Sequence, residues 1–205
     1  MLFRSILQSK VSSQQRDPAI ILVSLVIELV GMDWMIGSAK QDSPGLFILS
    51  TTIASIETRM ILDGKAVTDV VPKTTLLISC YNILEKAINF VIVNSGTFSS
   101  LKERHLPDMI SHSLPKVYGL ATEAIHSIMQ FLENVACTQV KEATGEYPSQ
   151  LVYASVRVLC AWMAEETAAL QDSICKLLPF LLKLGKESLD TSTGNVYDNH
   201  FYISL

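Results

Sequence analysis

Residues 76–91 read LLISCYNILEKAINFV and predict a helix that is apolar around most of its circumference. Apolar residues recur at three- and four-residue steps, and others beside them widen the stripe. The central stripe consists of Leu77, Tyr81, Leu84, Ile88 and Val91. The polar strip is narrow and consists of Ser79, Asn82, Lys86 and Asn89. We expect such a helix to pack on two or three sides, as the inner helices of stacked repeats do.

Helical spacing continues on both sides of this stretch. No strand pattern occurs, and apolar residues repeat at helical steps over about residues 18–30, 44–63, 72–93, 114–140, 151–167 and 168–186. These helices fall into three pairs that begin near Pro18, Pro72 and Pro148. Pairs that cannot bury their apolar faces alone must stack on one another. We therefore predict an all-α fold, an armadillo/HEAT-like α-solenoid of about three stacked helix pairs.

Proline and glycine set the expected helix ends. Asp17-Pro18 is typical of a helix cap followed by proline at the first helical position, and Gly31 should end that helix in a left-handed conformation. Pro179 should kink the last helix. Residues 101–113 are charged and should be helical only in short pieces. We expect one armadillo-like segment over residues 1–187 and a disordered tail over residues 188–205.

The helix over residues 44–63 is predicted to be amphipathic. Its inward face should carry Leu46, Leu49, Ile53, Ile56 and Met60. The opposite side should carry Thr51, Ser55, Thr58 and Arg59.

The composition excludes several classes of protein. Of the 205 residues, 49% are apolar and 18% charged, which excludes general disorder and leaves more apolar surface than a compact globule needs. The formal charge is -4 without any block of like charges, so we expect no nucleic-acid partner. The longest apolar stretches are interrupted by serine and by charged residues, so we expect no membrane span.

Motifs for catalysis or metal binding are missing from the sequence. No histidine pair at i and i+4, no Cys-x-x-Cys, no phosphate-binding loop and no nucleophile elbow is found. We therefore predict that the protein is not an enzyme and holds no metal or cofactor. The cysteines lie within apolar helical patterns and are predicted to be reduced core thiols; they are Cys80, Cys137, Cys160 and Cys175.

Arg157 interrupts the apolar run from Val152 to Ala164. An unpaired charge buried there would be strongly destabilising. We expect a structural ion pair with a carboxylate of the neighbouring helix, with Asp172 as the first candidate, or a side chain that extends to solvent. Residues 175–186 are basic and amphipathic, and so resemble a calmodulin-type target helix, but Pro179 and the adjacent apolar helix favour burial.

Two stretches carry a resemblance to a known family. Residues 152–167 read VYASVRVLCAWMAEET and residues 174–181 read ICKLLPFL. Both closely resemble the neurochondrin family, with shorter matches at residues 9–19, 33–34, 56–60 and 80–85. The likeness runs in order over about residues 1–187, and the chain departs from the family's continuation from about Ser188.

The resemblance implies the middle portion of a longer protein with an atypical armadillo-like fold. It implies a cytoplasmic protein, enriched in neurons and their projections, that favours neurite outgrowth and restrains phosphorylation of calcium/calmodulin-dependent kinase II. It transfers no catalytic motif. We therefore expect a non-enzymatic interaction scaffold with protein partners in that kinase's signalling. The alternatives are a peripheral membrane-associated helical module and a generic helical-repeat adaptor.

Overall fold

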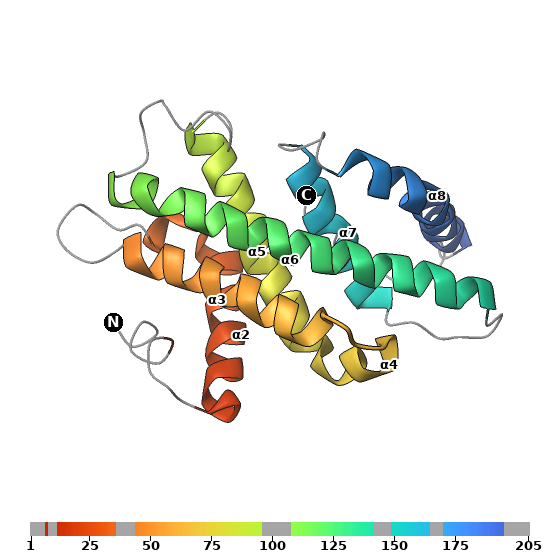
Figure 1. The fold of residues 1–205 in the computed structure, drawn as a ribbon, viewed down its shortest axis with the longest axis horizontal. Helices are drawn as coiled ribbons and strands as arrows, with labels where there is room; N and C mark the ends of the chain where they lie inside the picture. The colour runs from red at the N-terminus through yellow and green to blue at the C-terminus, as the bar shows by residue number, and fades with distance from the viewer. Residues whose placement is uncertain are drawn as a thin grey trace. The chain divides into compact units, whose positions relative to one another are not determined.

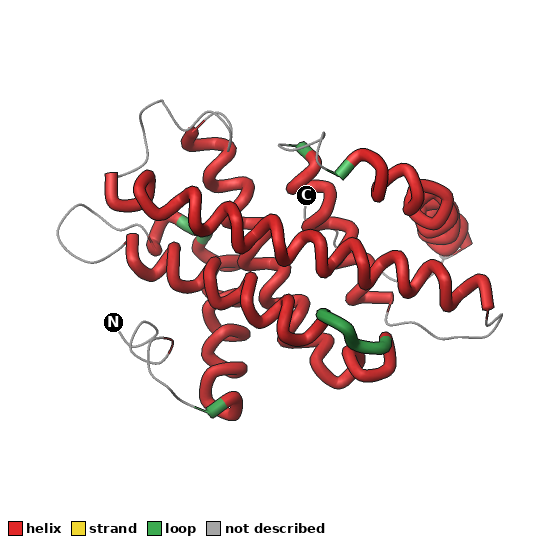
Figure 2. Tube along the Cα trace, in the orientation of Figure 1, coloured by secondary structure: helices red, strands yellow, loops and turns green. Residues whose placement is uncertain are grey.

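The computed structural model describes residue 7 and residues 12–35, 44–95, 108–141, 149–164 and 170–194. Within these ranges every long element is a helix, which confirms the all-α prediction (Figures 1 and 2). The long helices are α2 (Ser13–Val30), α3 (Pro44–Leu62), α5 (Thr74–Ser95), α6 (Asp108–Lys141), α7 (Ser149–Met163) and α8 (Gln171–Gly194). The short ones are η1 (Asp33–Met35), α4 (Val67–Val70) and η2 (Val71–Lys73).

The chain divides into two compact units, Met1–Thr167 and Ala168–Leu205. The first holds α2 to α7, and the second holds α8 with Pro179 in its interior. α8 runs to Gly194, past the predicted tail boundary at residue 188, because no proline follows Pro179 to end the helix. The rest of the predicted tail, 195–205, lies outside the described residues, as do residues 101–107. Residues 108–113, expected to be helical only in short pieces, instead form the start of the continuous helix α6. The predicted domain boundaries and the kink at Pro179 stay predictions.

Two helices begin earlier than the sequence predicts, and each has a proline inside it. α2 starts at Ser13 with Pro18 inside it, and α6 starts at Asp108 with Pro115 inside it. A proline removes one backbone N–H and crowds the carbonyl four residues earlier. Both prolines are exposed and close to a helix start, so solvent can reach the freed carbonyl. The helices can therefore extend one or two turns before them.

Gly31 ends α2, as the sequence predicts. Its φ angle is 86°, a value that favours glycine, and its N–H donates to the carbonyl oxygen of Ile27 at 2.8 Å. The chain then enters the short 3-10 helix η1.

α5 lies at the centre of the first unit. It packs against α2, α3 and α7, while α6 packs against α3 and α7 (Figure 1). The predicted stripe of α5 is fully buried: Leu77, Tyr81, Leu84, Ile88 and Val91. Burying each large apolar side chain contributes roughly 1.5–3 kcal/mol relative to leaving it exposed. The expectation of a helix packed on two or three sides is confirmed.

α3 buries the side opposite to the one predicted. Ser55 is 0% exposed and Thr58 is also buried, whereas Met60 is 63% exposed and Ile56 is exposed as well. The other members of the predicted inward face are only half-buried; they are Leu46, Leu49 and Ile53. The predicted orientation of this helix is therefore wrong.

Small side chains explain this orientation of α3. Helix α3 packs on both α5 and α6, and residues such as Ala54 and Ser55 let the backbones approach closely. The hydroxyls of Thr51 and Ser55 donate to the carbonyl oxygens of Phe47 and Thr51, each at 2.9 Å. Because these hydroxyls bond within their own helix, they can be buried without an unmet hydrogen bond.

Two stretches of the described chain are long and apolar enough to cross a membrane by length and composition alone. They are Gly45–Leu62, which is 44% buried, and Val67–Val93, which is 56% buried. A core helix passes the same test, and both stretches pack within the first unit. The expectation of no membrane span stays a prediction.

Candidate functional site

Arg157 of α7 pairs with Glu85 of α5. The guanidinium Nη2 donates to Glu85 Oε2 at 2.6 Å; the arginine side chain is 62% exposed and the glutamate side chain 16%. A carboxylate of a neighbouring helix was expected, and the observed one is Glu85. Asp172, the first candidate, belongs to the second unit, in the first turn of α8, so its pairing with Arg157 stays a prediction.

The exposure of Arg157 follows from its place on α7. Tyr153, Arg157, Cys160 and Ala164 are all exposed and recur at steps of three or four residues. They form one solvent-facing stripe. This stripe is not apparent from the sequence, because three of the four residues are apolar or weakly polar. Arg157 therefore meets both expectations, a carboxylate partner and access to solvent.

Arg157 and Glu85 border a groove between α2, α5 and α7. We call it the α2–α5–α7 groove, and its main lining residues are Ser24, Leu25, Glu28, Asn82, Glu85 and Arg157. Its cavity has a volume of about 180 Å³. The amide nitrogen of Asn82 donates to the hydroxyl oxygen of Ser24 at 2.9 Å and lies 3.3 Å from the Ser24 carbonyl oxygen. This amide links α2 to α5 at the floor of the groove.

Hydroxyl groups line the groove beside its charged residues. Tyr81 lies at its edge, and burial raises the pKa of its phenol far above the ordinary value, although the nearby Ser155 hydroxyl offsets part of that rise. A phenol of this kind stays protonated at physiological pH. The Ser24 hydroxyl accepts a hydrogen bond from the Asn82 amide, and the Ser79 hydroxyl donates to the Thr75 carbonyl oxygen. Sequence reasoning did not find Glu28 or Asn82, since neither carries a motif.

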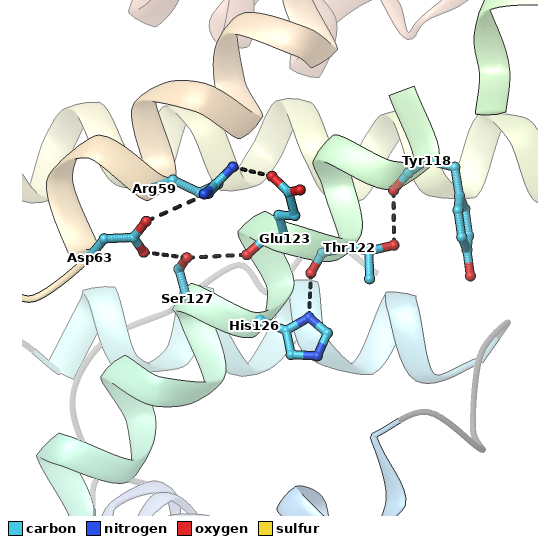
Figure 3. Close-up of polar contacts among 7 residues, drawn as sticks. All are labelled: Arg59, Asp63, Tyr118, Thr122, Glu123, His126 and Ser127. Carbon is cyan, nitrogen blue, oxygen red and sulfur yellow. Dashed lines mark hydrogen bonds and ion pairs between the residues drawn. The ribbon is translucent and has the colours of Figure 1, made fainter. Parts of the chain in front are cut away.

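A second polar cluster joins α3 to α6 (Figure 3). Arg59 of α3 pairs with Glu123 of α6, and its Nε lies 3.5 Å from Asp63 Oδ2. The hydroxyl of Ser127 donates to Asp63 Oδ1 at 2.6 Å. Arg59, Asp63 and Glu123 are part-exposed, so their ion pairs contribute little free energy individually. They fix the register of the two helices.

A third cluster joins the first turns of α2 to α3 and η2. Arg16 Nη2 lies 2.7 Å from Glu57 Oε1, and Lys73 Nζ lies 3.0 Å from Asp17 Oδ2. Glu57 is only 5% exposed. Burial raises the pKa of its carboxyl, and the positive charge of Arg16 opposes that rise. Glu57 is thus an ionisable group held in the core by one arginine.

The cysteines divide into one buried thiol and three exposed ones. Cys80 is in the core, as expected, and its burial raises the thiol pKa well above the ordinary range. The expectation of core thiols is wrong for the others, which are Cys137, Cys160 and Cys175. These three lie on the solvent-exposed sides of their helices. The helices contain so many apolar residues that the sequence does not show which side is exposed. All four are free.

Histidines and carboxylates do not converge in the part of the chain that the structure describes. No group of three or more His, Cys, Asp or Glu there is arranged to hold a metal ion. His126 is exposed, and its Nδ1 lies 2.8 Å from the carbonyl oxygen of Thr122 (Figure 3). The imidazole ring thus contacts the backbone of its own helix, α6.

Replacing Arg157 with alanine should lower the free energy of unfolding by at most about 1 kcal/mol, since the ion pair is exposed and screened by solvent. Urea denaturation of both proteins, followed by circular dichroism, measures the difference. A loss above about 2 kcal/mol, the range of buried pairs, would contradict the exposed position.

Glu57→Gln should change how stability depends on pH. The pKa of Glu57 is raised in the folded protein, so the folded state binds the proton more tightly than the unfolded chain does. Its contribution to stability is present below the ordinary glutamate pKa and is lost as pH rises through the raised one. Urea titrations across this window should show that loss in the parent protein and not in Glu57→Gln. Equal pH profiles of the two proteins would show that burial does not raise the pKa of Glu57.

The fold and these clusters define an all-helical protein whose described polar groups join helices and line a small groove. The Neurochondrin family model matches residues 1–198. The chain therefore belongs to the neurochondrin family.

Similar proteins agree with this membership. The chain is 33% identical over 181 residues to human neurochondrin, covering 88% of this chain and 22% of that protein. It is 31% identical over 183 residues to chicken neurochondrin and 28% identical over 183 residues to the Drosophila melanogaster neurochondrin homolog, covering 89% of this chain and 23% of each relative. The chain thus spans less than a quarter of the length of these relatives. No solved structure matches it significantly.

Proposed function

We propose that the chain is a non-enzymatic interaction scaffold built as part of an armadillo-like α-solenoid. The order of helix packing carries this proposal. Alternate helices lie side by side, α2 on α5 and α5 on α7, while α3 lies on α6. The first helices of the predicted pairs thus form one row, and the second helices of the first two pairs lie together. Two rows of alternate helices are the arrangement of stacked helix pairs.

Exposed apolar side chains support a role in binding proteins. Leu22, Leu25 and Leu29 follow one another along α2 at steps of three and four residues, and all are exposed. Ile56 and Met60 are likewise exposed and lie four residues apart on α3. Apolar rows of this kind are typical of surfaces that contact another protein segment.

The finer role rests on the resemblance to the family. We propose a cytoplasmic protein of neurons and their projections that favours neurite outgrowth and restrains phosphorylation of calcium/calmodulin-dependent kinase II. Because the chain spans less than a quarter of its relatives, activity of the whole protein need not reside in this part. The partners proposed are proteins of that kinase's signalling.

A phosphorylation assay with purified components tests this role. The kinase, activated by calcium and calmodulin, is incubated with ATP and increasing amounts of the 205-residue chain, and its phosphorylation is followed with time. The expected result is slower phosphorylation with the folded chain and no effect with Ser55→Asp, which should not fold. An unchanged rate, with no kinase retained on the immobilised chain, would contradict the kinase role.

A peripheral membrane-associated module is the second candidate, favoured by the exposed leucines of α2. Liposome flotation separates the two functions. The scaffold proposal expects the chain to stay with the soluble fraction. Flotation with the vesicles that is lost in Leu25→Ser/Leu29→Ser would favour the membrane function instead.

A further inference from the structure

The α2–α5–α7 groove contains an excess of negative charge. It is lined by two carboxylates, Glu28 and Glu85, and by one guanidinium, that of Arg157. Glu85 uses one oxygen for Arg157, whereas Glu28 is exposed and has no ionic partner among the described residues. A cation in this groove would therefore meet one carboxylate that is not ion-paired with any residue of the described ranges.

The direction of the helices brings the two carboxylates to the same end of the groove. Asp17 of α2 pairs with Lys73 of η2, directly before α5, and further along the chain Ser24 of α2 bonds to Asn82 of α5. Because both numbers of each pair increase together, α2 and α5 run in the same direction here. One turn beyond the Ser24–Asn82 bond, α2 presents Glu28 and α5 presents Glu85.

The end of α2 adds to the negative potential. Glu28 lies in the last turn of α2, which ends at Val30 and has no basic residue in that turn. The carboxyl end of a helix carries roughly -0.5 elementary charge, so a carboxylate there is unfavourable unless a cation is nearby. α2 provides no such cation from its own last turn.

Besides its charged groups, the groove is lined by hydroxyls, by the amide of Asn82 and by apolar side chains. The Asn82 amide nitrogen is used by Ser24, which leaves its carbonyl oxygen as an acceptor. Beside these acceptors, Leu25 and Ile78 provide partly exposed aliphatic wall. A cationic head on an aliphatic stem, with several donors in one plane, matches both features, and this is the chemistry of arginine.

We propose that the α2–α5–α7 groove binds an arginine side chain of an extended segment of a partner protein. Glu28 and Glu85 receive the guanidinium, the carbonyl oxygen of Asn82 accepts one of its N–H groups, and Leu25 contacts its stem. The proposal rests on the proposed scaffold function and names the chemistry that a partner would present. A divalent cation fits less well, since the described part of the groove offers only two carboxylates and no cluster of three metal-binding side chains.

The test is a nuclear magnetic resonance titration of the 205-residue chain. The probe is the blocked peptide acetyl-Gly-Ser-Arg-Ser-Gly-amide, and the same peptide with citrulline in place of arginine is the neutral control. We expect the arginine peptide to shift the Asn82 side-chain amide and the backbone amides of Glu28 and Glu85. The citrulline peptide should bind about tenfold more weakly, because a charge-assisted hydrogen bond becomes a neutral one.

Two variants locate the binding site. Glu28→Gln should weaken binding of the arginine peptide about tenfold, for the same reason, and Asp69→Asn, an equal change of charge on exposed α4, should not. Circular dichroism confirms that both variants fold. Equal binding by Glu28→Gln, no shifts with the arginine peptide, or the same shifts with calcium chloride alone would each overturn the proposal. The kinase assay does not depend on this peptide. If the chain slows phosphorylation but does not bind the peptide, the groove proposal is wrong and the scaffold proposal stands.

Discussion

Replacing Trp162 with alanine should lower the free energy of unfolding by about 3–5 kcal/mol, the range found for removing a buried tryptophan or phenylalanine. Trp162 is 1% exposed, and its ring stacks on that of Tyr118 with centroids 5.1 Å apart. The substitution removes this aromatic contact between α7 and α6 and leaves a cavity that the surrounding helices cannot fill. The loss is comparable with the whole stability of a small domain, so we expect partial unfolding at 37 °C.

Urea denaturation followed at 222 nm measures this effect. Tyr153→Ala is the matched control, because Tyr153 lies on the same helix but on its exposed stripe. The control should lose less than about 1 kcal/mol, as surface substitutions do. If the two variants were equally stable, the inward orientation of Trp162 would be wrong.

The helices were predictable where apolar residues dominate. In α5 the apolar stripe is wide, so any reading of the helical period places Leu77 and Tyr81 inside, and both are buried. The end of α2 was predictable because Gly31 has a positive φ angle that side chains other than glycine tolerate poorly. In both cases a local property of the chain decides the outcome.

The orientation of α3 was not predictable from its own sequence. Thr51 and Ser55 count as polar in any periodicity, yet they are buried where α3 packs on two neighbouring helices. Hydroxyls that bond to their own helix behave as small apolar groups, which no hydropathy scale records. The choice of face depends on α5 and α6, and therefore on tertiary structure.

The groove also could not be predicted from the sequence. Arg157 is a charged residue in an apolar run and so can be singled out from the sequence. Its partner, Glu85, lies 72 residues earlier in the chain. Nothing in either local pattern indicates that they meet. Glu28, Asn82 and Glu85 come together only because α2 and α5 run side by side, and single-sequence reasoning has no measure of that distance.

Ser55→Asp should destabilise the protein by about 3–5 kcal/mol, the cost of an uncompensated buried charge. Ser55 is 0% exposed on α3, and its hydroxyl already bonds to the Thr51 carbonyl. A carboxylate cannot donate to that carbonyl, and Arg59, the cation one turn further along α3, already pairs with Asp63 and Glu123. Thermal denaturation and urea titration should therefore show a protein that is largely unfolded at neutral pH, and more folded in mild acid, where the new carboxyl is protonated.

Two controls separate burial from the charge itself. Met60→Asp places the same charge on the exposed side of α3 and should change stability by less than about 1 kcal/mol. Ser55→Ala removes the hydroxyl with its internal hydrogen bond and keeps the small volume, so its cost should also be small. The sequence alone predicts the reverse order, with Met60→Asp severe and Ser55→Asp harmless. The comparison thus decides which face of α3 is in the core, and with it whether the row of Ile56 and Met60 is free to contact another protein.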